Sequence, residues 1–81
     1  MEAGLYVVGT PIGNLGDMTA RGIETLQAAS LILAEDTRQT RKLLTHFDIK
    51  TYCMSCHKFN EAQRCEEILD RIRSGEIIAM V

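Results

Sequence analysis

The stretch Leu5-Tyr6-Val7-Val8-Gly9-Thr10-Pro11-Ile12-Gly13-Asn14-Leu15-Gly16-Asp17 decides the fold of this chain. Its apolar beginning, 5–8, predicts a strand, and a helical pattern starts near Thr19. The glycine-rich loop 9–17 therefore follows the carboxyl end of the first strand. Ligands bind at that edge of open α/β sheets, and glycines let a backbone approach a ligand closely because they carry no Cβ.

The spacing of the glycines excludes two common nucleotide sites. It reads G-x-x-x-G-x-x-G, whereas a dinucleotide-binding loop reads G-x-G-x-x-G. The Lys and Ser/Thr of a P-loop are also missing, which argues against ATP or GTP hydrolysis. The pattern leaves a ligand-binding loop or a simple Pro/Gly turn in which Asp17 or Thr19 caps the next helix.

Apolar runs alternate with helical patterns along the rest of the chain. The predicted strands are 5–8, 31–34, 51–55 and 77–81, and the predicted helices are 19–29, 37–46 and 60–74. The order β-α-β-α-β-α-β predicts an α/β fold with a parallel sheet and right-handed crossovers. Because the chain stops inside an apolar strand, we expect a fragment that ends just before a functional loop.

The third helical segment has the clearest pattern. Asn60 with Gln63 resembles a capping box, and Gly75 is a stop signal. The predicted buried stripe consists of Ala62, Cys65, Ile68, Leu69 and Ile72.

Length and composition limit the class of protein. The 81 residues allow at most one small domain, and 46% hydrophobic with 25% charged residues is ordinary for a globular chain. The net charge of -2 argues against a basic nucleic-acid-binding module. No apolar run is long enough for a membrane span, and no signal peptide is visible, so we expect a cytoplasmic location without a membrane.

The segment Glu35-Asp36-Thr37-Arg38 places two carboxylates after the second strand. Asp36 either caps the following helix or acts as a base or substrate anchor. Arg38, Arg41 and Lys42 occupy neighbouring helical positions, where they either meet a phosphate backbone or form a solvated basic face.

Cys53-Met54-Ser55-Cys56-His57 matches the haem-attachment pattern C-x-x-C-H. Residues three apart on a strand point to opposite faces, so Cys53 and Cys56 can converge on a haem only if the strand ends between them. The same condition applies to a zinc site made of Cys53, Cys56, His57 and Cys65. We therefore expect ordinary thiols and no metal. His57 is either a general acid/base or a hydrogen-bonding surface group.

Three segments together resemble a known family. Residues 5–19 resemble the N-terminal signature of the small-subunit ribosomal RNA methyltransferase I family, within the tetrapyrrole methylase superfamily. Ala34-Glu35-Asp36-Thr37-Arg38 resembles its second motif, and His57 with Asn60-Glu61 resembles its third, H-x-x-N-E. Lys58-Phe59 departs from the family, in which acidic or His residues are common at these positions.

The resemblance implies a fold and an activity. Members methylate a ribose 2′-hydroxyl of a cytidine in small-subunit ribosomal RNA, with S-adenosylmethionine as cofactor. They are two-lobed α/β homodimers that bind the cofactor between the lobes. Residues 1–81 resemble the first part of the N-terminal lobe only. The family's next motif, a Ser-Asp-Ala-Gly-Thr-Pro type loop, would follow Val81, and the C-terminal lobe is absent.

The resemblance also implies roles for the first loop. Pro11, Ile12 and Gly13 would lie near the methyl donor. Asn14 and Asp17 would lie near the RNA or support the loop.

The other two motifs would supply the remaining site residues. Asp36 is the catalytic candidate, because a 2′-hydroxyl is a poor nucleophile that needs a base or an accurate hydrogen bond. Arg38 would contact a phosphate or ribose. His57, Asn60 and Glu61 would take part in substrate binding.

Two other functions remain open at this point. A tetrapyrrole methyltransferase of the same superfamily is one, although those enzymes tend to carry a Gly-Pro-Gly-Asp form of the first loop. The other is a non-catalytic α/β module that binds phosphate or a partner.

Overall fold

The computed structural model describes residues 1–11, 13–57 and 59–81. Its elements follow the predicted order with small shifts at their ends. They are β1 (Gly4–Val7), the 3-10 turn η1 (Leu15–Asp17), α1 (Ala20–Ala28), β2 (Leu31–Ala34), α2 (Thr37–His46), β3 (Cys53–Ser55), α3 (Glu61–Arg73) and β4 (Ile77–Met80). The predicted β-α-β-α-β-α-β fold is confirmed.

The four strands form one parallel sheet in the order β1-β4-β2-β3. The last strand therefore lies between the first two. Ile32 of β2 is opposite Ala79 of β4 on one side and Cys53 of β3 on the other. Because the strands are parallel, all four carboxyl ends lie at the same edge of the sheet.

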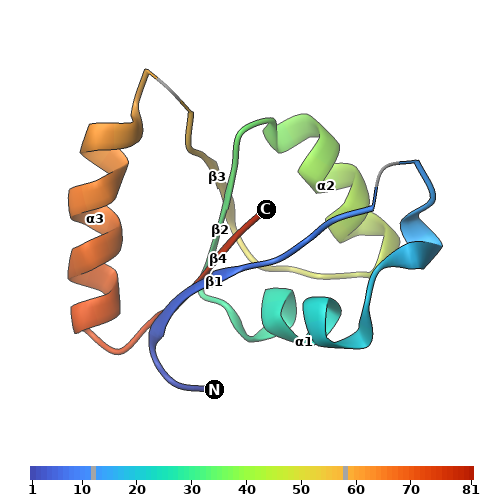
Figure 1. Cartoon of the computed structure of the whole chain (residues 1–81), viewed down its shortest axis with the longest axis horizontal. Helices are drawn as coiled ribbons and strands as arrows, with labels where there is room; N and C mark the ends of the chain where they lie inside the picture. Colours follow the sequence, from blue (N-terminus) through green and yellow to red (C-terminus); the bar gives the residue numbers. More distant parts are fainter. Residues whose placement is uncertain (12, 58) are drawn as a thin grey trace.

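Helices cover the two faces of the sheet unequally. Figure 1 shows α1 and α2 on one side of the sheet and α3 on the other. Side chains alternate between these sides along β2: Ile32 packs in the larger cluster with α1 and α2, and Leu33 packs in the smaller cluster with Ile68 of α3. All of β2 is buried, as its continuous apolar sequence predicts.

Two of the predicted helix signals are confirmed. Thr19 caps α1, because its Oγ1 accepts a hydrogen bond of 3.0 Å from the Gly22 N–H. Gly75 follows α3 with a φ of 94°, a left-handed conformation that favours glycine. The N–H groups of Gly75 and Glu76 donate to the carbonyls of Ile72 and Arg71 at 2.9 and 3.1 Å, which satisfies the end of the helix.

The predicted buried stripe of α3 is wrong in part. Ala62, Cys65 and Leu69 are exposed. The covered side of the helix instead carries Arg64, Glu67, Ile68, Arg71 and Ile72. The aliphatic stems of arginines cover apolar surface while their charged ends reach acids or water. The side of α3 that faces the sheet therefore combines two isoleucines with charged residues.

The cysteines lie in three different environments. Cys53 is buried in the cluster beneath α1 and α2, whereas Cys56 packs against the cluster beneath α3. The two side chains thus point to opposite faces, as strand alternation predicts. Cys65 is exposed on α3, not buried in its stripe as expected.

This arrangement predicts an order of thiol reactivity. Burial raises the pKa of the Cys53 thiol, and the nearby Arg41 charge opposes this only in part. We therefore expect iodoacetamide to modify exposed Cys65 well before Cys53 in the folded protein. Peptide mass spectrometry after short reaction times measures the order, and faster labelling of Cys53 would show that α3 or β3 is misoriented.

One part of the sheet is not covered by a described helix. Leu5 is 44% exposed and Val7 is 79% exposed, both on edge strand β1. Their register partners on β4 are Ile78 and Met80, which belong to the α3 side of the sheet. α3 therefore covers the centre of this face and leaves β1 open. Among the described residues no helix is long and apolar enough to cross a membrane.

Candidate functional site

The first loop holds its shape through its own polar and glycine residues. The Oδ1 of Asn14 accepts a hydrogen bond of 2.9 Å from the Gly16 N–H and so caps η1. Gly13 has a φ of 95°, which an L side chain rarely adopts. The loop-supporting role of Asn14 is thus visible in the structure. Asp17 is exposed at the end of η1.

A cavity of about 210 Å³ lies between the first loop and α2. Its walls mix apolar with hydroxyl and amide groups. They are Thr10, Pro11, Gly13 and Leu15 from the loop, and Gln39, Thr40 and Leu43 from α2. Pro11 and Gly13 therefore line the cavity next to the strand ends, whereas Ile12 lies outside the described residues. The sequence analysis did not predict that the three α2 residues line a cavity. The available signal was the spacing of Gln39 and Leu43, which are one helical turn apart and so lie on the same side of the helix.

Asp36 caps α2 at the carboxyl end of β2. Its Oδ1 accepts a hydrogen bond of 3.0 Å from the Arg38 N–H and lies 3.7 Å from Arg38 Nε. Its carbonyl accepts the hydroxyl of Thr40, one of the cavity residues, at 3.2 Å. The Asp36 side chain remains 51% exposed, so capping leaves it accessible to a substrate. The capping alternative is therefore realised, and the catalytic role stays a prediction.

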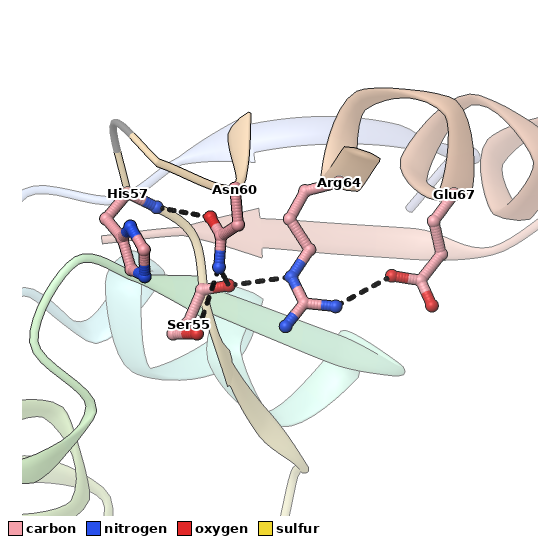
Figure 2. A network of polar contacts seen from close by, with 5 residues as sticks. All are labelled: Ser55, His57, Asn60, Arg64 and Glu67. Carbon is pink, nitrogen blue, oxygen red and sulfur yellow. Dashed lines mark hydrogen bonds and ion pairs between the residues drawn. The ribbon is translucent and has the colours of Figure 1, made fainter. Parts of the chain in front are cut away.

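The loop between β3 and α3 contains a connected polar network (Figure 2). The Asn60 Oδ1 accepts the His57 N–H at 2.8 Å, and the Asn60 Nδ2 donates to the carbonyl and hydroxyl of Ser55 at 3.4 and 3.3 Å. Arg64 donates from Nε to the same carbonyl at 2.9 Å and pairs with Glu67 at 3.5 Å. The end of β3 is thus tied to the first turns of α3.

The network corrects the predicted capping box. Asn60 precedes α3, but its side chain makes no capping hydrogen bond, because its oxygen and nitrogen are used by the loop. Arg64 is a contributor that the sequence analysis missed. The only signal for it is its position four residues after Asn60, which places both on the same side of the helix start.

A further hydrogen bond in this loop determines which ring nitrogen of His57 carries the proton. Its Nδ1 accepts a hydrogen bond of 3.2 Å from the Phe59 N–H. In the neutral ring the proton is then on Nε2, which is the nitrogen available as a donor. Glu61 is exposed in the first turn of α3, where a negative charge suits the helix dipole. Lys58 lies outside the described residues.

The sheet brings some of the predicted site residues to one place. Ala34 is opposite Ser55, so Asp36 and His57 each follow neighbouring strand ends by two residues. The first loop starts on β1, beyond β4, and reaches α2 across that edge. Arg38 is 86% exposed and lies on the outer side of α2 rather than in the cavity.

Among the described residues, no three His, Cys, Asp or Glu side chains are grouped closely enough to hold a metal ion.

A parallel α/β sheet with a glycine-containing loop and polar side chains at its carboxyl edge defines a class of α/β proteins that bind ligands at this edge. The family model described as Tetrapyrrole (Corrin/Porphyrin) Methylases matches residues 4–81. The chain belongs to this family. A solved structure of a cobalamin biosynthetic enzyme, cobalt precorrin-4 methyltransferase, has the same fold, with a TM-score of 0.72 at 21% identity over 94% of this chain and 32% of that one.

Several curated relatives share more of the sequence. Proteins named "Ribosomal RNA small subunit methyltransferase I" from Synechocystis sp. and Escherichia coli are 56% and 51% identical to this chain over 77 residues. A protein of the same name from Vibrio cholerae is 48% identical. The matches cover 95% of this chain but only 27–28% of the relatives. The chain thus spans just over a quarter of their length.

Proposed function

We propose that residues 1–81 are the first part of the N-terminal lobe of an S-adenosylmethionine-dependent enzyme. Its reaction is 2′-O-methylation of a cytidine ribose in small-subunit ribosomal RNA. The names of the relatives at 48–56% identity support the RNA substrate, and the family match supports the methyltransferase class. The cytidine and its 2′-hydroxyl rest on the resemblance of the three sequence motifs.

The observation that carries the proposal is the cavity between the first loop and α2. Hydroxyl and amide groups of Thr10, Gln39 and Thr40 suit a polar cofactor, and Pro11 and Leu43 suit its apolar parts. The volume of about 210 Å³ is below the roughly 300 Å³ at which cavities begin to enclose a ligand of this size. The residues present therefore fit part of S-adenosylmethionine, and the remaining contacts must come from other residues.

When bound, S-adenosylmethionine would supply an electrophilic methyl group for the ribose oxygen, with the thioether as leaving group. The tasks left to the protein are to align the two groups and to manage the hydroxyl proton. The half-exposed carboxylate of Asp36 accepts this proton in our proposal. Arg38, Asn14 and Asp17 contact the RNA. His57 donates from Nε2 to the substrate. Asn60, which holds this loop, and the exposed Glu61 contact the substrate beside it.

The proposal also covers the location and the oligomeric state of the enzyme. It is a cytoplasmic homodimer with a second lobe that completes the cofactor site. One observation supports such assembly: Leu5 and Val7 are exposed on edge strand β1, and edge strands readily pair with other chains.

Methyl transfer by the full-length enzyme tests the proposal. We expect label from S-adenosylmethionine to enter small ribosomal subunits, and nuclease digestion followed by chromatography to identify 2′-O-methylcytidine. Incubation with a reduced tetrapyrrole serves as the parallel reaction. Label in the tetrapyrrole, or on a base instead of a ribose, would contradict the proposal.

A further inference from the structure

Helix α2 has an unusual distribution of charge. Its sequence, TRQTRKLLTH, contains three basic residues and no acidic one. The whole chain has 11 acidic and 9 basic residues, so this helix differs in sign from the rest of the molecule. On α3, by contrast, Arg64, Arg71 and Arg73 each form an ion pair with an acid.

The basic residues of α2 share one side of the helix. Its opposite side is buried in the core through Thr40, Leu43 and Leu44. The outer side forms one wall of a shallow groove of about 470 Å³. The groove is lined by Leu15, Arg38, Arg41, Lys42, Thr45 and His46. Its lining thus carries three permanent cations, a hydroxyl and an imidazole.

The groove adjoins the proposed cofactor cavity. Leu15 of the first loop lines both of them. A strand lying in the groove therefore passes the mouth of the cavity. Among the described residues neither Arg41 nor Lys42 forms an ion pair, and the only acid that contacts the group is Asp36, through Arg38.

We infer that the groove along α2 binds the phosphate backbone of the RNA substrate and leads it to the methyl-transfer site. From Arg38 to His46 the helix rises by about 12 Å. That length accommodates about three phosphates at the roughly 3.4 Å axial spacing of a stacked strand. Backbone contacts of this kind set the position of the nucleic acid without reading its sequence. This inference rests on the proposed function for the identity of the substrate.

The test uses the full-length enzyme and a mixed-sequence single-stranded RNA. The double variant Arg41→Gln/Lys42→Gln is expected to bind this RNA about tenfold more weakly at low salt. The slope of log K against log salt should become shallower by about 1.4, since each lost phosphate contact removes roughly 0.7 for a single strand. Binding of S-adenosylmethionine, measured by calorimetry, should not change.

The matched control is Lys50→Gln/Arg73→Gln, which removes the same charge from residues outside the groove. Neither residue lines the groove, so the RNA affinity should stay near wild type. Their ion pairs with Asp48 and Asp70 are exposed, so their loss should also change the stability little. An equal loss in both variants, or no loss in the α2 variant, would overturn the inference. Absence of methyl transfer by the wild-type enzyme, in contrast, counts against the proposed function alone.

Discussion

Replacing Asp36 with alanine is expected to slow methyl transfer by the full-length enzyme by about 10²-fold or more, because the ribose hydroxyl then loses its proton acceptor. The same change removes the cap of α2, the 3.0 Å hydrogen bond to the Arg38 N–H. We expect this to cost about 1 kcal/mol of stability. Single-turnover kinetics and urea denaturation of the same preparation measure the two effects.

Two further variants separate catalysis from capping. Asp36→Asn keeps an oxygen that caps the helix but cannot take up a proton, so activity should fall while stability is retained. Thr19→Ala removes the corresponding cap of α1 and should cost a similar free energy without slowing the reaction. Full activity of the Asn variant would show that Asp36 is a capping residue only.

The largest effect on stability is expected at the centre of the sheet. Ile78 has no exposed surface and packs with Leu31, Leu33 and Ile68. Ile78→Ala should reduce the free energy of unfolding by about 2–5 kcal/mol through lost burial and the cavity left behind. A chain of this size has a total stability of about 4–12 kcal/mol, so the variant is expected to lose a large share of its stability. Urea denaturation of the 81-residue chain measures the loss.

The matched control is Val7→Ala on the neighbouring strand. Val7 belongs to the same side of the sheet but is 79% exposed, so its truncation should change the stability by less than about 0.5 kcal/mol. Equal losses at Val7 and Ile78 would mean that another segment or a second copy covers β1 in solution.

The type and order of the elements followed from the sequence because each signal is local. The apolar run 31–34, Thr19 before α1 and Gly75 after α3 report on their immediate neighbours, and the structure uses each of them. The order of the strands in the sheet is not local. Helical crossovers allow several orders of parallel strands, and no residue in the sequence specifies β1-β4-β2-β3.

For the candidate site too, the positions set by local signals could be predicted, and those set by packing between elements could not. Positions after the strands placed Pro11, Gly13, Asp36 and His57 at one edge, and the structure agrees. The rotation of α3 depends instead on the surface on which the helix lies. Apolar spacing alone therefore assigned Cys65 to the buried stripe, whereas the sheet selected a different side of the helix.

The insertion of β4 between β1 and β2 also determines when the chain can fold as it is synthesised. A growing polypeptide can join β2 to β3 early, because these neighbours are separated only by α2. β1 is synthesised first, yet its partner is β4. The pairing of Gly4 with Ile77 can therefore form only after residue 77 has been synthesised. Closing so long a segment carries an entropic cost that the short β2–β3 connection does not. The glycine loop thus lies against α2 on a paired strand only after the ribosome has synthesised β4.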